Sequence, residues 1–424
     1  MFETRPQKTQ ERALLIGLEK KGVSKWDLHD SLEELRELAN SAGAEVVDTV
    51  TQKLQKPTAP YYIGRGKAES IKESCQHQRV TSVIFDDELS PAQGRNLENL
   101  LARKVLDRTQ LILDIFAQRA RSREGRLQIE LAQLQYLLPR LTRMWHHLSR
   151  QTGGIGTRGP GETQLEVDRR RVQERIARLE RELEAVRKTR AIQRESRKRH
   201  QWPVAAVVGY TNAGKSTLLN LLTGADVVTE NKLFATLDPT TRSLVLPNKQ
   251  RVLLTDTVGF LRKLPHTLIE SFKATLEEVS EADLLIHIVD LSHPRVDEQM
   301  EAVDGVIKEL DAYGKQTLIV FNKIDNLPNR ELAESYVKRF SGSVAISART
   351  GEGINKLVQA LENALTSWRL RSRLRISANE SALIAEIHRV GHVLELRYEG
   401  NDALIVAHVP PDLAQKLERY TEAS

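Results

Sequence analysis

Apolar residues in the first part of the chain follow two different spacings. Short apolar runs such as residues 13–18 (ALLIGL) and 80–85 (VTSVIF) are typical of buried strands, whereas residues 28–43 and 91–102 place apolar side chains at helical spacing. The two kinds of segment alternate, which is typical of a parallel sheet whose strands are connected through helices. We therefore expect an N-terminal parallel α/β domain over residues 1–118.

The apolar spacing changes over residues 119–200. Apolar residues from Leu127 to Leu148, and again from Val172 to Val186, alternate steps of four and three. Two such stripes predict two helices that pack along each other as an antiparallel hairpin. The break between them, Gly153–Gln164 (GGIGTRGPGETQ), cannot continue a helix because it holds several glycines and a proline. We expect a helical hairpin with a glycine-rich tip.

The predicted hairpin carries the positive charge of the chain. Residues 118–200 contain 21 Lys and Arg against 10 Asp and Glu, a net charge of +11, whereas the whole chain has +6. The rest of the chain is therefore net acidic. Two interpretations stay open: a solvated face of a coiled coil, or a rod that contacts phosphates through Arg and Lys.

Two more domains are expected over residues 201–369 and 370–424. In the last one, residues 382–390 and 411–420 have helical spacing, and residues 393–409 form two strands around an EGND turn. With a short strand before the first helix, this order predicts a small βαββα, or α+β, domain. The chain as a whole is predicted to be a multidomain α/β protein.

Neither a membrane segment nor a disulfide framework is expected. No run of 18 apolar residues occurs, and the N-terminus lacks the apolar core and cleavage site of a signal peptide. Cys75 is the single cysteine, which excludes a disulfide pair within the chain and favours a buried thiol. We expect a soluble, cytoplasmic monomer without membrane insertion.

A glycine-rich loop stands between a valine-rich strand and a helix at residues 204–224 (VAAVVGYTNAGKSTLLNLLTG). It matches the phosphate-binding pattern G-x-x-x-x-G-K-S/T in the required strand–loop–helix context. Loop amides and the helix N-terminus would point at phosphate oxygens, Lys215 would reach the β- and γ-phosphates, and the Ser216 hydroxyl would ligate Mg²⁺. The predicted nucleotide-binding residues of this loop are Gly209, Tyr210, Thr211, Asn212, Ala213, Gly214, Lys215, Ser216 and Thr217.

Two later motifs select the base. Residues 321–325 (FNKID) follow an apolar strand and resemble the N-K-x-D signature of GTPases, in which the Asp accepts both the ring N–H and the exocyclic amine of guanine. Adenine offers no such pair of donors, so a buried Asp325 would be left unpaired. Residues 347–349 (SAR) resemble the S-A-K element, with Arg in place of Lys. The predicted guanine-binding residues are Asn322, Lys323, Ile324, Asp325, Ser347, Ala348 and Arg349.

Two segments between these motifs would sense the γ-phosphate. Residues 251–260 (RVLLTDTVGF) supply a D-x-x-G element, in which Asp256 would hold Mg²⁺ through water and the Gly259 amide would contact the γ-phosphate. In residues 234–242 (FATLDPTTR), one threonine should close over Mg²⁺; FATLD resembles the first switch of Obg-like GTPases, which selects Thr236, with Thr240 and Thr241 as alternatives. Further predicted nucleotide-binding residues are Phe234, Ala235, Thr236, Leu237, Asp238, Asp256, Thr257, Val258 and Gly259.

We therefore predict a GTP-hydrolysing site with Lys215, Thr236 and Gly259 as catalytic residues and Ser216 and Thr236 as metal ligands. Phe260 stands where Ras-like proteins carry the glutamine that orients water, so slow intrinsic hydrolysis and completion by a partner are expected. Asn212 occupies a position at which some related GTPases coordinate K⁺. Stabilisation of the loop by its side chain is the alternative role.

Several of these segments together resemble the HflX family, which belongs to the Obg-HflX-like translation-factor class of GTPases. The resemblance lies in residues 153–170 (GGIGTRGPGETQLEVDRR), 209–224 and 234–244, and also in 90–98 and 113–120. It covers about residues 61–371. It implies a factor that binds GTP and GDP, contacts the large ribosomal subunit and its rRNA, and dissociates stalled or idle 70S ribosomes before hydrolysis resets it.

The residues of the hairpin are compatible with such a partner. Glycines of the tip permit close backbone approach, and Arg158, Arg169, Arg170 and Arg171 could neutralise phosphates. Two other functions stay open: an NTP-dependent, helicase-like protein that remodels rRNA, although no helicase motif is present, and a nucleotide-gated ribosome assembly or binding scaffold. For residues 63–67 (IGRGK), a plain turn, an rRNA contact and a second nucleotide site are alternatives.

Overall fold

The computed structural model describes residues 11–22, 25–141, 164–198, 202–224, 233–234, 237, 240–248, 250–263, 276–366 and 370–421. The chain divides into two compact units. The first contains the described residues up to Val186, together with short pieces from further along the chain: Leu233, Phe234, Leu237, Arg262 and Lys263. The second contains the other described residues from 187 onward. The predicted domain boundaries at residues 118, 200 and 369 stay a prediction.

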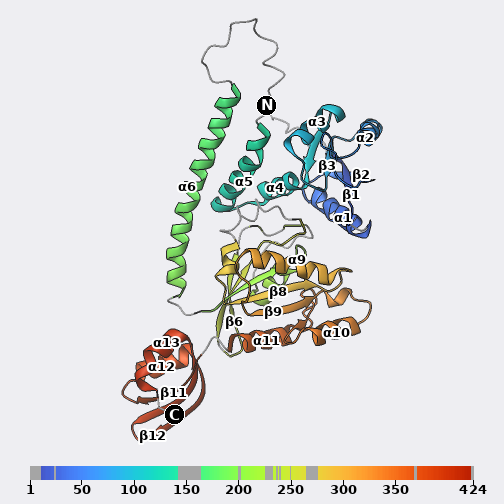
Figure 1. Cartoon of the computed structure of the whole chain (residues 1–424). Coiled ribbons are helices and arrows are strands. Elements are labelled where there is room, and N and C mark those ends of the chain that lie inside the picture. The colour runs from blue at the N-terminus through green and yellow to red at the C-terminus, as the bar shows by residue number, and fades with distance from the viewer. Residues whose placement is uncertain are drawn as a thin grey trace, which may run out of the picture. The chain divides into compact units, whose positions relative to one another are not determined.

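A four-stranded parallel sheet of order β2-β1-β3-β4 forms the centre of the first unit (Figure 1). Its strands are β1 (Arg12–Glu19), β2 (Glu45–Lys53), β3 (Ser82–Phe85) and β4 (Lys104–Asp107). The helices that connect and follow them are α1 (Lys25–Ser41), α2 (Arg65–His77), α3 (Pro91–Leu101) and α4 (Arg108–Arg119). The predicted parallel α/β fold is therefore confirmed.

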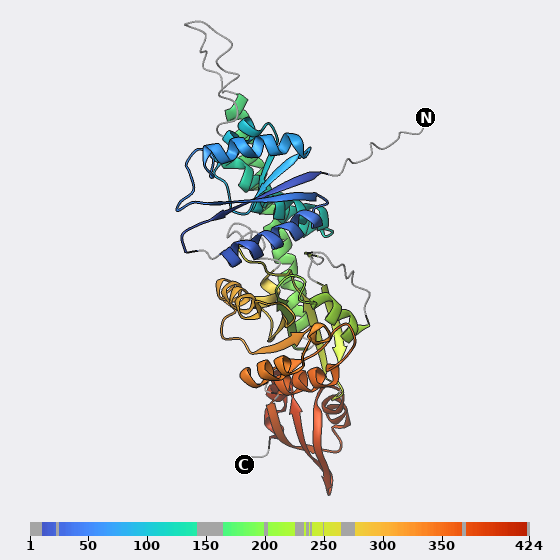
Figure 2. The ribbon, with the colours of Figure 1, turned by 90° about the vertical axis from the view of Figure 1, so that its right-hand side faces the viewer.

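Helices cover both faces of this sheet. Leu14 and Phe85 face a core that includes Ile71 of α2 and Leu97 of α3, and Figure 2 shows α1, in dark blue, on the opposite face. Apolar strands buried on both faces are typical of parallel sheets. Cys75 lies in the same core, where burial raises the pKa of its thiol.

Carboxylates mark the ends of β3 and β4. Asp107 accepts a hydrogen bond from the Gln110 amide at 2.9 Å and so caps α4. Asp86 follows directly after β3, and its side chain is 1% exposed. Because the carboxyl ends of parallel strands meet at one edge, Asp86 lies beside Arg108, the first residue of α4, in a 2.9 Å ion pair.

Two long helices follow α4 in the chain. They are α5 (Arg123–Leu141) and α6 (Gln164–Lys198). Leu127 and Leu131 of α5 pack with Leu179 and Leu183 of α6 in one apolar cluster. Ion pairs connect Arg123 with Glu182 and Glu130 with Arg175, so residue numbers rise along one helix as they fall along the other. The predicted antiparallel hairpin is confirmed for these helices, while residues 142–163, including most of the predicted tip, lie outside the described residues.

A six-stranded sheet of order β10-β9-β8-β5-β7-β6 forms the centre of the second unit (Figure 1). Its strands are β5 (Val204–Gly209), β6 (Thr240–Val245), β7 (Arg251–Asp256), β8 (Leu284–Asp290), β9 (Thr317–Asn322) and β10 (Val344–Ala345). Only the β6–β7 pair is antiparallel among these described strands. The helices that accompany it are α7 (Lys215–Thr223), α9 (Val296–Glu309), η1 (Ile324–Asn326), α10 (Glu331–Arg339) and α11 (Ile354–Thr366).

The two faces of this sheet have separate cores. Leu218 of α7 and Leu361 of α11 pack with Val207 and Ile286 on one face. Val289 and Phe321 pack with helices α9 and α10 on the other. The central strands β5, β8 and β9 end at the same edge, which is where open α/β sheets place their ligands.

A small antiparallel sheet of order β11-β13-β12 completes the described chain. Its elements are β11 (Leu370–Ser377), α12 (Ser381–Val390), β12 (His392–Glu399), β13 (Asp402–Val409) and α13 (Pro411–Leu417). Ile376 and Ile405 pack with Ile387 and Leu413 of the two helices. The predicted βαββα order is confirmed. Within the described residues, no helix is both long and apolar enough to cross a membrane.

Candidate nucleotide-binding site

The predicted phosphate loop joins β5 to α7. Gly209 ends β5 and Gly214 caps α7, with φ angles of +152° and +100°. A Cβ atom at Gly209 would lie 2.3 Å from the carbonyl oxygen of Ile288, and one at Gly214 would lie 2.2 Å from Nδ2 of Asn322. Glycine is therefore required at both positions. The first amides of α7 have no partners within the helix, which makes this end suited to an anion.

Lys215, the first residue of α7, folds back onto the loop. Its Nζ donates to the carbonyl oxygens of Tyr210 at 2.9 Å and Gly209 at 3.3 Å. Burial lowers the pKa of Lys215 to about 8, although the nearby Asp256 carboxylate acts in the opposite direction. Because burial disfavours an ammonium without an anionic partner, a bound phosphate would stabilise its charge.

Oxygen donors that fit Mg²⁺ meet at the end of β7. The Ser216 hydroxyl donates to Oδ2 of Asp256 at 2.7 Å, and Asp256 is fully buried. Thr240, the first residue of β6, pairs with Asp256 in the ladder, while the Thr241 hydroxyl lies 3.0 Å from that of Thr255. Hydroxyl and carboxylate oxygens are the ligands that Mg²⁺ prefers. Three predicted residues of the segment before Thr240 lie outside the described residues: Ala235, Thr236 and Asp238.

The D-x-x-G element lies tightly against the phosphate loop. The Thr257 hydroxyl donates to the Val207 carbonyl of β5 at 2.7 Å, and Val258 is buried. At Gly259, a Cβ atom would lie 2.7 Å from Cα of Thr211 and 2.9 Å from Nζ of Lys215. A larger residue would displace one of these two groups, so Gly259 permits the close approach.

Phe260 is tied to the loop through its backbone. Its amide donates to the Gly209 carbonyl at 3.1 Å, and its carbonyl accepts from the Thr211 amide at 2.8 Å. The phenyl side chain is buried, at 2% exposure. It contains no donor or acceptor with which to orient water.

Asn322 connects the base-binding motifs to the phosphate loop. Its Nδ2 donates to the Ala213 carbonyl at 2.8 Å, and its Oδ1 accepts from the Ala348 amide at 2.9 Å. Asn322 is 2% exposed, so both bonds are shielded from water. One side chain therefore fixes the phosphate loop and the S-A-R loop to the end of β9.

Asp325 presents an acceptor that the described protein does not use. It lies in η1, and its Oδ1 is buried without a hydrogen-bond partner among the described residues. A buried carboxylate oxygen without a donor is costly. A guanine edge, which carries two adjacent N–H donors, would satisfy it, so the residue fits the predicted ligand.

The other residues of the two base-binding motifs differ in their contacts and exposure. Lys323 has a φ of +62°, and its Nζ forms a 2.7 Å ion pair with Asp290 at the end of β8. Ile324 is buried. Ser347 and Ala348 are also buried, whereas Arg349 is exposed. Asp290 was not predicted from the sequence. The signal that could have identified it is its position at the end of a strand that runs parallel to the phosphate-loop strand.

Phe234 and Leu237 belong to a different compact unit from the other described residues of the predicted site. Both belong to the first unit and are at most 3% exposed. The Phe234 ring meets Phe116 of α4 edge-on, with 4.5 Å between the ring centroids. The other predicted residues that the structure describes lie in the phosphate loop, at the end of β7 and in the two base-binding loops.

This fold and these motifs define a P-loop GTPase. Three family models match the chain: "GTP-binding GTPase N-terminal" over residues 29–117, "GTP-binding GTPase Middle Region" over 119–197 and "50S ribosome-binding GTPase" over 204–323.

Curated relatives match over nearly the whole length. GTPase HflX of Caldanaerobacter subterraneus subsp. tengcongensis is 52% identical over 411 residues, which cover 97% of this chain and 94% of the relative. GTPase HflX of Escherichia coli strain K12 is 47% identical, with 86% and 85% of the two chains covered. The chain belongs to the GTPase HflX family.

A solved structure also matches over most of the chain. It is that of a GTP-binding protein from the archaeon Sulfolobus solfataricus in complex with GDP, at 26% identity and a TM-score of 0.45. The match covers 84% of this chain and 99% of that one.

Proposed function

We propose that the GTP-bound protein binds the large ribosomal subunit, dissociates stalled or idle 70S ribosomes, and leaves after GTP hydrolysis. Support comes from the matching model for 50S ribosome-binding GTPases and from the basic hairpin, whose net charge of +11 contrasts with the acidic remainder of the chain. RNA phosphates are the partner that such a rod attracts.

The assignment of the nucleotide as GTP rests on Asp325. Its buried and unsatisfied Oδ1 needs a donor, and guanine supplies a ring N–H together with an amine. Asn322 fixes the adjacent S-A-R loop through the Ala348 amide, and the Ile324 amide next to Asp325 donates to the Ile346 carbonyl. An adenine base offers no matching pair of donors, so ATP would leave Asp325 unpaired.

The phosphates would lie on the loop between Gly209 and Ser216. Loop amides donate to phosphate oxygens, and the Lys215 ammonium neutralises their charge. Ser216, together with Thr236, would ligate Mg²⁺, and Asp256 would hold it through water; the ion would neutralise charge between the β- and γ-phosphates. The Gly259 amide would contact the γ-phosphate and lose that contact after hydrolysis.

Hydrolysis by the isolated protein is expected to be slow. Phe260 contributes no polar group to water, and a GTPase without such a group depends on a partner or a rearrangement to orient the nucleophile. The large subunit is the partner that we propose for this step. Hydrolysis then follows binding, which makes the GTP-bound state the one that acts on ribosomes.

The hairpin is proposed as the main contact with rRNA. Arg169, Arg170 and Arg171 are exposed at the beginning of α6, next to the predicted tip. Phosphate contacts of this kind position a protein on RNA largely without base recognition. Arg158, in the tip, belongs to the same proposal and lies outside the described residues.

Sedimentation on sucrose gradients tests this partner. With a non-hydrolysable GTP analogue, the protein should migrate with large subunits, and with GDP it should stay near the top. Replacing Arg169, Arg170 and Arg171 by Ala should weaken the association and reduce its salt dependence. Lys338→Ala, at an exposed position of α10, is the matched control. Equal migration of the triple variant and the control would contradict the hairpin contact.

A further inference from the structure

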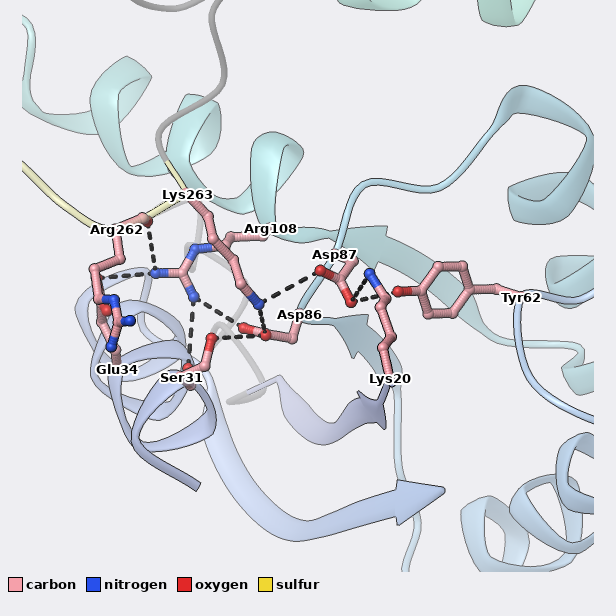
Figure 3. A network of polar contacts seen from close by, with 9 residues as sticks. All are labelled: Lys20, Ser31, Glu34, Tyr62, Asp86, Asp87, Arg108, Arg262 and Lys263. Carbon is pink, nitrogen blue, oxygen red and sulfur yellow. Dashed lines mark hydrogen bonds and ion pairs between the residues drawn. The ribbon is translucent and has the colours of Figure 1, made fainter. Parts of the chain in front are cut away.

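Two segments adjacent to the nucleotide site in sequence lie within the first unit. Arg262 and Lys263 follow Phe260 after one residue, and Phe234 begins the segment that contains Thr236. Side chains near the carboxyl edge of the four-stranded sheet hold Arg262 and Lys263 (Figure 3). Phe116 of α4 contacts Phe234. We call these residues the switch clamp: Asp86, Asp87, Arg108, Phe116, Phe234, Arg262 and Lys263.

Arg108 is the buried centre of the clamp. Its side chain is 3% exposed and forms 2.9 Å ion pairs with Asp86 and with Glu34 of α1. The same guanidinium donates to the Arg262 carbonyl at 3.3 Å. A planar group with several fixed donors can hold two carboxylates and a backbone oxygen at once. Arg108 therefore fixes the backbone of the segment that contains Arg262 and Lys263.

Lys263 forms ion pairs with the carboxylates next to Arg108. Its Nζ forms ion pairs with Asp86 and, at 3.4 Å, with Asp87. Asp87 is also paired with Lys20 at 3.1 Å and accepts a hydrogen bond from the Tyr62 hydroxyl. Burial alone would raise the pKa of Asp87, but Lys263, Tyr62 and Lys20 bring it below its usual value, so the Asp87 carboxylate presents negative charge to Lys263.

Contacts with helices α1 and α4 hold the segment that begins near Phe234. Its ring meets Phe116 edge-on, and the Leu233 amide donates to the Ser41 hydroxyl at 3.3 Å. Phe234 and Lys263 have φ angles of +57° and +55°, which non-glycine residues rarely adopt. Such conformations persist where surrounding contacts impose them. The clamp therefore holds each segment in one specific conformation.

Gly259 and Lys215 lie close together where a γ-phosphate would bind. A phosphate oxygen that accepts from both the Gly259 amide and Lys215 must lie between them. A methyl-sized group on Gly259 would already lie 2.9 Å from Nζ of Lys215, and the Phe260 backbone is bonded to Gly209 and Thr211. A γ-phosphate that contacts the Gly259 amide would therefore displace Gly259 or the Lys215 ammonium, whereas GDP carries no phosphate at that position.

We propose that Lys263, held by Asp86 and Asp87, determines how strongly the protein discriminates between GTP and GDP. Lys263 is four residues from Gly259, so the clamp would oppose a displacement of Gly259 by the γ-phosphate. By thermodynamic reciprocity, bound GTP weakens the clamp, and the N-terminal domain responds to the nucleotide. The inference rests on the proposed role of Gly259 as the γ-phosphate contact.

Calorimetric titration of the full-length chain with GDP and with a non-hydrolysable GTP analogue tests this inference. In Lys263→Ala, affinity for the analogue relative to GDP should rise by about fivefold. The Lys263 side chain is 45% exposed, so this variant should fold. Asp87→Asn should shift the ratio in the same direction, and Lys263→Arg, which keeps the charge, should retain most of the original ratio.

Lys53→Ala is the matched control, because it removes a 3.2 Å ion pair between an exposed lysine and Glu19 in the same sheet. Its affinity ratio should equal that of the unmodified chain. An unchanged ratio in Lys263→Ala, or an equal change in Lys53→Ala, would overturn the clamp and leave the nucleotide site intact. If the unmodified chain bound ATP as tightly as GTP, the assignment of the site itself would fail, and the clamp with it.

Discussion

Nδ2 of Asn322 donates a 2.8 Å hydrogen bond to the carbonyl oxygen of Ala213, which lies 109 residues earlier in the chain. The bond fixes the phosphate loop to the strand end that carries the base-binding residues. The other side-chain atom, Oδ1, accepts from Ala348 in the third loop of the site. The three loops are therefore oriented relative to one another by one buried amide.

Asn322→Ala should weaken both GTP and GDP binding. The change leaves the buried Ala213 carbonyl and Ala348 amide without their partner, at a cost of about 1–3 kcal/mol for each group. Affinity for both nucleotides should therefore fall by roughly tenfold or more. Fluorescence titration measures it, with Asn329→Ala, at an exposed contact with Glu331, as the control. A selective loss of GTP alone would contradict this account.

Asp325→Asn should change the base preference. The side chain would lose its negative charge and gain an N–H donor, so it could no longer accept two bonds from guanine. Affinity for GTP should fall on the order of 100-fold, since hydrogen bonds to charged groups contribute about 1.5–3 kcal/mol each. Xanthine nucleotides, which carry a carbonyl instead of the amine, should bind better than before. Unchanged selectivity for GTP over xanthosine triphosphate would refute the role of Asp325.

Nucleotide affinity should decrease as the pH rises above about 8. Burial lowers the pKa of Lys215 to about 8 in the free protein, so the ammonium is lost in that range. Phosphate favours the charged form and raises this pKa, so binding takes up protons between the two pKa values. Calorimetry at pH 8.5 in two buffers of different ionisation enthalpy measures the uptake. Zero proton uptake would show that Lys215 is fully charged in the free site.

Potassium should accelerate hydrolysis if Asn212 helps to coordinate it. Asn212 is exposed in the phosphate loop with a φ of +61°, a conformation that asparagine tolerates well. Rates of phosphate release in KCl and NaCl at equal ionic strength separate the two roles proposed for this residue. A higher rate in KCl that Asn212→Ala abolishes supports coordination. Equal rates in both salts would leave loop stabilisation as its role.

The elements of the site were predictable because its motifs are local. The spacing from Gly209 to Ser216 already requires a strand, a tight loop and a helix, and the structure has β5 and α7 there. The order of strands and helices also followed from hydrophobic spacing. Hydrophobic spacing and short motifs are local in the chain, so they indicate which element a residue belongs to and whether that element is buried.

Contacts between distant residues were not predictable in the same way. Lys263 and Asp86 are 177 residues apart, and Lys323 and Asp290 belong to different strand ends. Such pairs depend on which elements pack together, and no spacing in one sequence encodes that. The role of Thr236 and the hairpin tip stay predictions.

Light scattering by intact 70S ribosomes tests the central claim most directly. When the protein is added with GTP or a non-hydrolysable analogue, the scattered intensity should fall as ribosomes separate into subunits, and with GDP it should stay constant. Asp325→Asn with GTP should also leave the signal constant, because its nucleotide site is impaired. If the signal fell in neither triphosphate state, the proposed splitting function would be wrong; binding without splitting would instead indicate a scaffold.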